Sequence, residues 1–258
     1  MAKPKIGVQL IVFGGRQNED LAGVLAEVKE AGYEGIEAGN LFQACGEEAA
    51  KKALADTGLL VTGVHGGYGD LTRPDNVEQN MAYLKAVNSR YLICSGVSDR
   101  SSIKGYEESA ETFNELGRRC KDEGLVFCYH NHAWEFEDLG GGVKGIHRLC
   151  ELTDPELVKL CLDVYWVHIG GEDPAEFIAR HADRAEYFHF KDGGPNKDDP
   201  SGRPYFIELG QGEVDLESAR DAALKQNPEW IVCEQDRSEK DPKVSVTESM
   251  EYLRKIGL

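Results

Sequence analysis

The sequence lacks any apolar run of the roughly 20 residues that a membrane-spanning helix requires. No signal-peptide-like apolar segment separates Met1 from the first strand signal at Ile6, so we expect a cytoplasmic location and no membrane partner. Basic residues are also scarce, because 29 Lys and Arg stand against 46 Asp and Glu, for a formal net charge of −17. Such a charge opposes binding to nucleic acid and to anionic membranes. A small-molecule substrate is the expected partner.

The seven cysteines are odd in number and form no CxxC pair. Cys94, Cys128, Cys161 and Cys233 all lie inside apolar strand-like runs. This pattern is typical of reduced, buried thiols that pack as small hydrophobic groups, and a disulfide framework is not expected.

A glycine-rich phosphate loop is also missing. The segment after the first strand signal, Val12-Phe13-Gly14-Gly15-Arg16, does not have the GxGxxG spacing, and the chain contains no P-loop. An open, doubly wound sheet that binds a nucleotide would normally carry such a loop after its first strand. That architecture is therefore the second choice for this chain.

Short apolar runs alternate with amphipathic helical segments along the whole chain. In the first helical segment Leu21, Val24, Leu25 and Val28 keep the three-and-four spacing of one apolar face. The expected strands are 6–10, 35–38, 60–65, 91–94, 125–130, 158–163, 185–190 and 230–234, and the expected helices are 19–31, 46–57, one from 74, 106–123, 143–152, one from 173–174, 215–225 and 242–256. Eight such units in 258 residues predict an α/β protein made of one (β/α)8 TIM barrel, a single domain over residues 1–258. The longest polar insertion is predicted at 191–204.

Four of the expected strands end in a residue that can bind a metal: His130, Asp163, His189 and Glu234. The C-terminal strand ends of such a barrel converge on one site. Two imidazoles and two carboxylates suit manganese, zinc, cobalt or iron better than calcium, with magnesium also open. Asp163 could alternatively cap a helix, and Glu234 could pair with Arg237.

Two further residues are candidates for proton transfer. His132 lies two positions after His130, so both face the same side of the strand. One of them could bind the metal while the other moves protons, or both could bind substrate. Lys191 lies on the same side as His189 and could act as an electrophile or as an acid and base. Its alternative role is that of a rim lysine paired with Asp192.

The walls of the pocket are predicted from residues near other strand ends. Phe13, Tyr68 and Trp166 should form an apolar side, because the C–H faces of sugars stack on aromatic rings. Glu37 and His65, at the ends of the second and third strands, should contact substrate hydroxyl groups.

The chain resembles sugar phosphate isomerase/epimerase-like proteins of the xylose isomerase-like barrel superfamily. The segments that carry the resemblance are Tyr129-His130-Asn131-His132, Trp134-Glu135-Phe136, Leu162-Asp163-Val164-Tyr165-Trp166, Gly170-Gly171-Glu172-Asp173-Pro174, Phe188-His189-Phe190-Lys191-Asp192, Glu208 to Asp215 and Glu234-Gln235-Asp236. In many of these proteins a divalent ion, often manganese, is held by a strand-five glutamate with Asp, His and Glu from strands six to eight. Asp163, His189 and Glu234 match the last three positions, and His130 stands where the glutamate would lie.

The resemblance implies a metal-dependent isomerase or epimerase for a sugar or keto-sugar. A base, for which His132 is suited, would remove the proton next to a carbonyl, the ion would stabilise the resulting enediolate, and Lys191 and Glu234 would assist. A dehydratase or a 3-keto-glycoside-cleaving lyase is the alternative, and a sugar-binding subunit without catalysis is a third. An endonuclease IV type of enzyme shares the barrel, but seven histidines and the charge of −17 argue against it. The resemblance also implies a homodimer or homotetramer.

Overall fold

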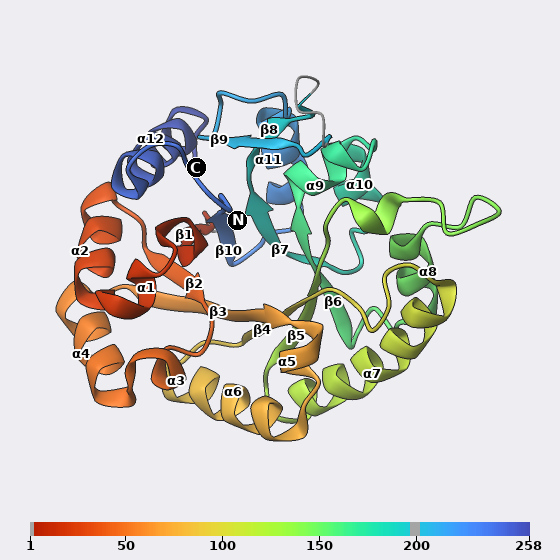
Figure 1. The fold of residues 1–258 in the computed structure, drawn as a ribbon, viewed down its shortest axis with the longest axis horizontal. Coiled ribbons are helices and arrows are strands. Elements are labelled where there is room, and N and C mark those ends of the chain that lie inside the picture. Colours follow the sequence, from red (N-terminus) through yellow and green to blue (C-terminus); the bar gives the residue numbers. More distant parts are fainter. Residues whose placement is uncertain (1–2, 197–201) are drawn as a thin grey trace.

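The protein is an eight-stranded parallel barrel surrounded by helices, described here from a computed structural model (Figure 1). The structure describes residues 3–196 and 202–258. Around the closed barrel the strands follow the order β1-β10-β7-β6-β5-β4-β3-β2, so each strand neighbours the next one in the chain apart from the inserted pair β8 and β9. The predicted TIM barrel is therefore confirmed. No helix of the described residues is both long and apolar enough to cross a membrane.

The barrel strands lie close to their predicted positions. They are β1 (Lys5–Gln9), β2 (Gly35–Ala38), β3 (Leu60–Gly67), β4 (Tyr91–Ser95), β5 (Val126–His130), β6 (Val158–Asp163), β7 (Ala185–Phe190) and β10 (Trp230–Cys233). Five of the seven cysteines are buried, Cys94, Cys128, Cys161 and Cys233 among them, and all seven are free thiols.

The helices begin and end where local side chains require it. Proline occupies the first turn of α6, α10 and α12, where the missing N–H costs nothing. The helices are α1 (Arg16–Glu19), α2 (Leu21–Ala31), α3 (Leu41–Cys45), α4 (Glu47–Thr57), α5 (Tyr68–Leu71), α6 (Pro74–Ala86), α7 (Ile103–Asp122), α8 (Gly145–Leu152), α9 (Val164–Ile169), α10 (Pro174–Arg180), α11 (Leu216–Leu224) and α12 (Pro242–Lys255), with 3-10 turns η1 (Leu10–Phe13) and η2 (Trp134–Phe136).

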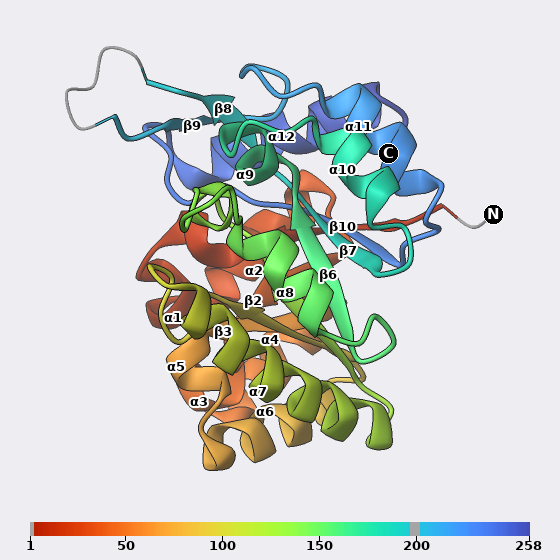
Figure 2. The same cartoon turned by 90° about the vertical axis from the view of Figure 1, so that its right-hand side faces the viewer.

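Two differences from the predicted elements matter for the site. The helix predicted over 19–31 is α2, which begins at Leu21 because the side chain of Asp20 accepts a hydrogen bond from the backbone N–H of Gly23, and the short α1 precedes it. The predicted polar insertion at 191–204 includes one strand of an antiparallel hairpin, β8 (Asp192–Gly194) with β9 (Tyr205–Ile207). Figure 2 shows this hairpin projecting from the end of the barrel opposite to the N-terminus. Residues 197–201 of the insertion lie outside the described residues.

A buried carboxylate, Glu208, ties the segment after β9 to the segment after β10. It is 2 % exposed and accepts hydrogen bonds from Ser238 Oγ at 3.0 Å and Ser245 Oγ at 2.6 Å, with Lys240 Nζ at 2.9 Å. Burial opposes ionisation, but these donors outweigh it and lower the pKa of Glu208 to about 2. The ionised carboxylate therefore stabilises the folded chain.

We expect Glu208→Gln to lower the free energy of unfolding at pH 7 by about 1.5–3 kcal/mol, the usual contribution of hydrogen bonds to a charged group. Because the pKa is depressed in the folded state, the stabilisation is present above the ordinary pKa of 4.5 and is lost as the pH falls towards about 2. In urea unfolding, the difference in the free energy of unfolding between the unaltered protein and Glu208→Gln should therefore be smaller at pH 3 than at pH 7. The exposed Glu239, changed to Gln, serves as control, and an equal gap at both pH values would contradict the assignment.

Candidate active site and metal centre

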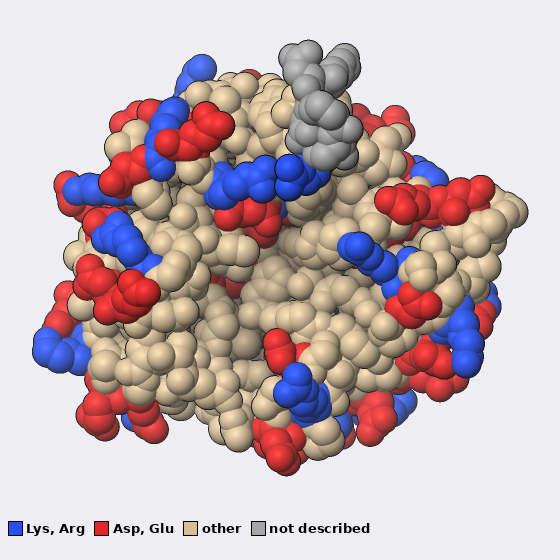
Figure 3. All heavy atoms as spheres, viewed as in Figure 1, with Lys and Arg blue, Asp and Glu red and all other residues tan. Residues whose placement is uncertain are grey.

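The four residues predicted as metal ligands lie together at the C-terminal ends of their strands. His130 ends β5, Asp163 ends β6, His189 lies in β7, and Glu234 directly follows β10. One ligand atom from each lies within 4.8 Å of the corresponding atom of every other residue. All four side chains are at most 5 % exposed. Space-filling atoms show a hollow in the middle of this face, with acidic side chains inside it (Figure 3). We call these four residues the ligand cluster.

The polar atoms of the ligand cluster face one another without hydrogen bonds. The buried atoms that have no hydrogen-bond partner include His130 Nδ1 and Nε2, Asp163 Oδ2, His189 Nδ1 and Glu234 Oε2. His130 Nε2 lies 3.5 Å from both Asp163 Oδ2 and Glu234 Oε2, and His189 Nδ1 contacts Glu234 Oε2. Buried polar atoms nearly always have partners. The donor set fits one divalent cation, because nitrogen and oxygen ligands lie about 2.0–2.2 Å from such an ion and thus about 4 Å apart across it.

Opposite charges in the ligand cluster stabilise one another. Burial opposes ionisation of Glu234, but Lys191 and His189 hold the pKa of this carboxyl well below its usual range. Burial also disfavours a charged imidazole at His130, yet Asp163 and Glu234 raise its pKa. The Glu234 carboxylate is therefore ionised and ready to bind a cation.

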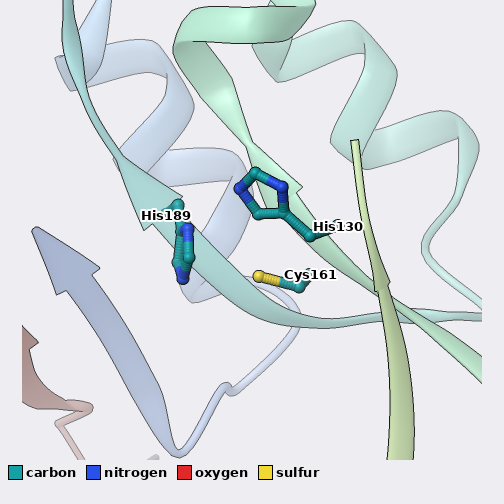
Figure 4. Close-up of side chains that lie close together, drawn as sticks. All are labelled: His130, Cys161 and His189. Carbon is teal, nitrogen blue, oxygen red and sulfur yellow. The ribbon is translucent and has the colours of Figure 1, made fainter. Parts of the chain in front are cut away.

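Cys161 lies beneath the ring of His130 in Figure 4, with its sulfur directed towards His189. Its sulfur belongs to a second close group with His130 and His189. Burial raises the pKa of the Cys161 thiol to about 12, so it is neutral and packs as a small apolar group. The sequence analysis placed Cys161 in the core but not next to the candidate ligands.

Lys191 is fully buried beside the ligand cluster. Its ammonium group pairs with Asp236, lies 3.5 Å from Glu234 Oε1, and lies 3.9 Å from Asp163 Oδ2. Burial alone would lower its pKa, but these carboxylates raise it, so Lys191 stays charged. Three aromatic rings surround the ammonium group, with centroids at 4.6 to 5.6 Å: Trp166, Phe206 and Tyr165.

Asp192 is not the partner of Lys191. Its carboxylate accepts hydrogen bonds from four backbone N–H groups, those of Gly193, Gly210, Gly212 and Val214, at 2.8 to 3.2 Å. A Cβ atom on Gly212 would lie 2.2 Å from Asp192 Oδ1, so this turn requires glycine. The alternative of a rim lysine paired with Asp192 does not hold in this structure.

Asp163 caps a helix with one carboxylate oxygen and faces the other candidate ligands with the second. Its Oδ1 accepts a hydrogen bond from Trp166 N at 3.0 Å and so caps α9, while Oδ2 faces the ligand cluster. Asn131 fixes the strand end from the side, because its amide accepts from Asp163 N at 3.1 Å and donates to Asp163 O at 3.3 Å. The capping bond also orients α9, which carries Trp166 next to Lys191.

His132 is held at the mouth by stacking. Its ring lies 3.8 Å from the ring of Trp134 at an interplanar angle of 15°, and 4.9 Å from His130. Its backbone N–H donates to the buried Glu135 at 2.8 Å, and Glu135 also accepts from Tyr129 OH at 2.6 Å. Burial lowers the pKa of His132, and its side chain is 19 % exposed. His132 is therefore a neutral imidazole in this structure, and its burial makes it a weaker base than a free histidine.

Glu37 and His65 lie beside His189 and His130. Glu37 is fully buried and contacts two imidazoles, His65 Nδ1 and His189 Nε2, both at 2.8 Å. Burial opposes its ionisation, but the two imidazoles lower the pKa of Glu37 to about 2. The ring of His65 lies 4.8 Å from that of His130, and its side chain is 10 % exposed.

The predicted aromatic wall is spread over three elements. Trp166 lies in α9 and is partly buried, with Lys191 over its ring. Tyr68 starts α5 and packs edge-on against Phe113 at 5.8 Å. Phe13 ends η1 and is 3 % exposed. Their contact with a substrate remains a prediction. Sequence reasoning did not identify Phe206 or Asp236 as site residues. The position of Asp236, two residues after the candidate ligand Glu234, could have indicated it.

The chain matches a profile of xylose isomerase-like TIM barrels over residues 25–256. It belongs to that family. Inosose dehydratase from Lacticaseibacillus casei is 25 % identical over 265 residues, which cover 88 % of this chain and 86 % of the relative. The family includes sugar isomerases, epimerases and dehydratases that act on small sugar substrates.

Solved structures share the fold. A sugar phosphate isomerase/epimerase from Parabacteroides distasonis superposes with a TM-score of 0.80 at 23 % identity and covers 98 % of each chain. The 3-keto-D-glucoside 4-epimerase from E. coli gives a TM-score of 0.73 at 19 % identity, covering 98 % of this chain and all of that one. At these identities the likeness is one of architecture.

Proposed function

We propose that this protein is a divalent-metal-dependent enzyme that removes a proton next to a carbonyl group of a sugar or keto-sugar. The observation that carries the proposal is the ligand cluster, whose buried donor atoms lie within 4.8 Å of one another and have unused lone pairs. Manganese is the first candidate, and zinc, cobalt, iron and magnesium are the others. When bound, such an ion supplies Lewis acidity that polarises a carbonyl and stabilises negative charge beside it.

The side chains around the ligand cluster divide the remaining work. His132 is a neutral imidazole at the mouth and takes the proton from carbon, because a general base must be unprotonated and within reach of its substrate. Lys191 is a fixed positive charge that stabilises the oxygen on which negative charge develops. Glu234 serves as a ligand and, through its pair with Lys191, fixes the ammonium group in place.

The fate of the carbanion determines the product. Return of the proton to the neighbouring carbon isomerises the sugar, and return to the opposite face epimerises it. Loss of a β-substituent gives a dehydratase, which is the second candidate function. Two considerations favour it: the sequence relatives include inosose dehydratases, and His130 stands where, by the resemblance, many proteins of this kind carry a strand-five glutamate.

The test is hydrogen–deuterium exchange in deuterated water over a panel of keto-sugars and keto-inositols, with added Mn²⁺. We expect one substrate class to exchange its α-proton, and product analysis by NMR then separates isomerisation, epimerisation and elimination. Cation binding without exchange on any member of the panel would contradict an enzymatic role and favour a sugar-binding subunit.

A further inference from the structure

One buried carboxylate holds two histidines of the site at once. Glu37 comes from β2, and its two oxygens contact different imidazoles, His65 Nδ1 and His189 Nε2, each at 2.8 Å. In the barrel, β1 and β10 separate β2 from β7, so the contact with His189 crosses the interior. Glu37 and His189 are each fully buried, so this arrangement is protected from water.

These contacts determine where the protons lie on both rings. An ionised carboxylate only accepts hydrogen bonds, so the ring nitrogen facing Glu37 must carry hydrogen in each imidazole. A neutral His189 therefore has its proton on Nε2 and its lone pair on Nδ1. Nδ1 is the atom that faces Glu234 in the ligand cluster and has no hydrogen-bond partner. For His65 the same reasoning leaves the lone pair on Nε2.

We infer that Glu37 is a positioning residue that presents Nδ1 of His189 to the cation and, with its other oxygen, fixes the orientation of His65 beside it. The inference rests on the proposed function only in assuming a cation at the ligand cluster. It replaces the prediction that Glu37 contacts a substrate hydroxyl, because both carboxylate oxygens are already engaged. His65 keeps its predicted contact with substrate.

The buried hydroxyl groups of Tyr187 and Thr62 are hydrogen-bonded to one another. Tyr187 OH lies 2.6 Å from Thr62 Oγ1, which donates to the backbone oxygen of Ile36 at 3.2 Å. All three side chains are fully buried. Burial and then the nearby carboxylate of Glu37 raise the pKa of Tyr187, so this hydroxyl group lies close to Glu37 as well.

The first measurement uses the unaltered protein. In Zn²⁺-loaded protein, ¹⁵N NMR of the imidazoles should show His189 protonated at Nε2 and bound to the metal through Nδ1. This readout does not depend on turnover or on any variant folding. A His189 bound through Nε2 would overturn the inference.

The second measurement compares Glu37→Gln with Glu135→Gln by titration with Mn²⁺ alone, following free Mn²⁺ by EPR. The amide introduced by Glu37→Gln has one oxygen and can accept from only one of the two imidazole N–H groups, so we expect about ten- to hundredfold weaker binding, the usual cost of losing a partner of a metal-bound histidine. Glu135 is the matched control, since it is equally buried in the same site but bonds Tyr129 and the backbone of His132.

Two results of the titration would overturn the inference. One is equal affinity in Glu37→Gln and unaltered protein. The other is two Mn²⁺ ions per unaltered chain and one per Glu37→Gln chain, because that would make Glu37 a ligand. A protein that binds Mn²⁺ as expected and exchanges no proton would instead remove the proposed function and leave the role of Glu37 intact.

Discussion

Replacing His132 by alanine should abolish α-proton exchange while leaving the cation in place. His132 stacks on Trp134 at 3.8 Å and lies outside the ligand cluster. A general base typically contributes about a hundredfold to ten-thousandfold in rate. We therefore expect exchange to fall by that factor at saturating Mn²⁺, with the Mn²⁺ dissociation constant little changed. NMR measures the rate of α-proton exchange, and EPR titration measures the dissociation constant for Mn²⁺.

The control for this prediction is His147→Ala. His147 lies on α8, where it pairs with Glu172 at 3.2 Å, so the substitution removes an imidazole away from the ligand cluster. It should change neither the exchange rate nor the affinity for Mn²⁺. Retained exchange in His132→Ala would mean that the base lies elsewhere.

Replacing His130 by alanine should weaken binding of the cation first and reduce α-proton exchange as a consequence. His130 is 1 % exposed, and both its ring nitrogens are without hydrogen bonds in the ligand cluster. Loss of a direct ligand should cost at least as much as loss of a supporting residue, which is about ten- to hundredfold in affinity. We expect metal occupancy to fall first, and excess Mn²⁺ to restore part of the exchange.

Swapped phenotypes in the two variants would exchange the roles of His130 and His132. If both variants behaved like unaltered protein, the strand-five histidines would be structural. Metal content after dialysis, measured by mass spectrometry, distinguishes these outcomes without any substrate.

The barrel and the ligand cluster could be predicted because both follow from local rules. Strand periodicity and helix signals repeat eight times, and parallel strands bring their C-terminal ends to one face. His130, Asp163, His189 and Glu234 all occupy that position, so their proximity needed no knowledge of side-chain packing. The match to the family profile and the closed strand order confirm the fold.

Contacts across the barrel could not be predicted in this way. Glu37 and His189 are 152 positions apart, and their strands are not neighbours. Nothing in the local pattern of either strand indicates that one carboxylate serves two imidazoles. The hairpin of β8 and β9 was missed for a different reason, because each strand has three residues and the pairing depends on backbone contacts with Asp192.

The carboxylate of Asp192 stands between Lys191 and the hairpin of β8 and β9. On one side lies Lys191, to which we assign a role in the reaction; on the other begins the hairpin that brings Phe206 against the same ammonium group. Asp192 accepts hydrogen bonds from the backbone at the start of this insertion, at Gly193. It also accepts them from the backbone at the end, at Gly210, Gly212 and Val214, so one carboxylate joins the two ends. An engineer who alters the described part of this segment would need to keep Glu208, whose carboxylate ties it to the segment after β10.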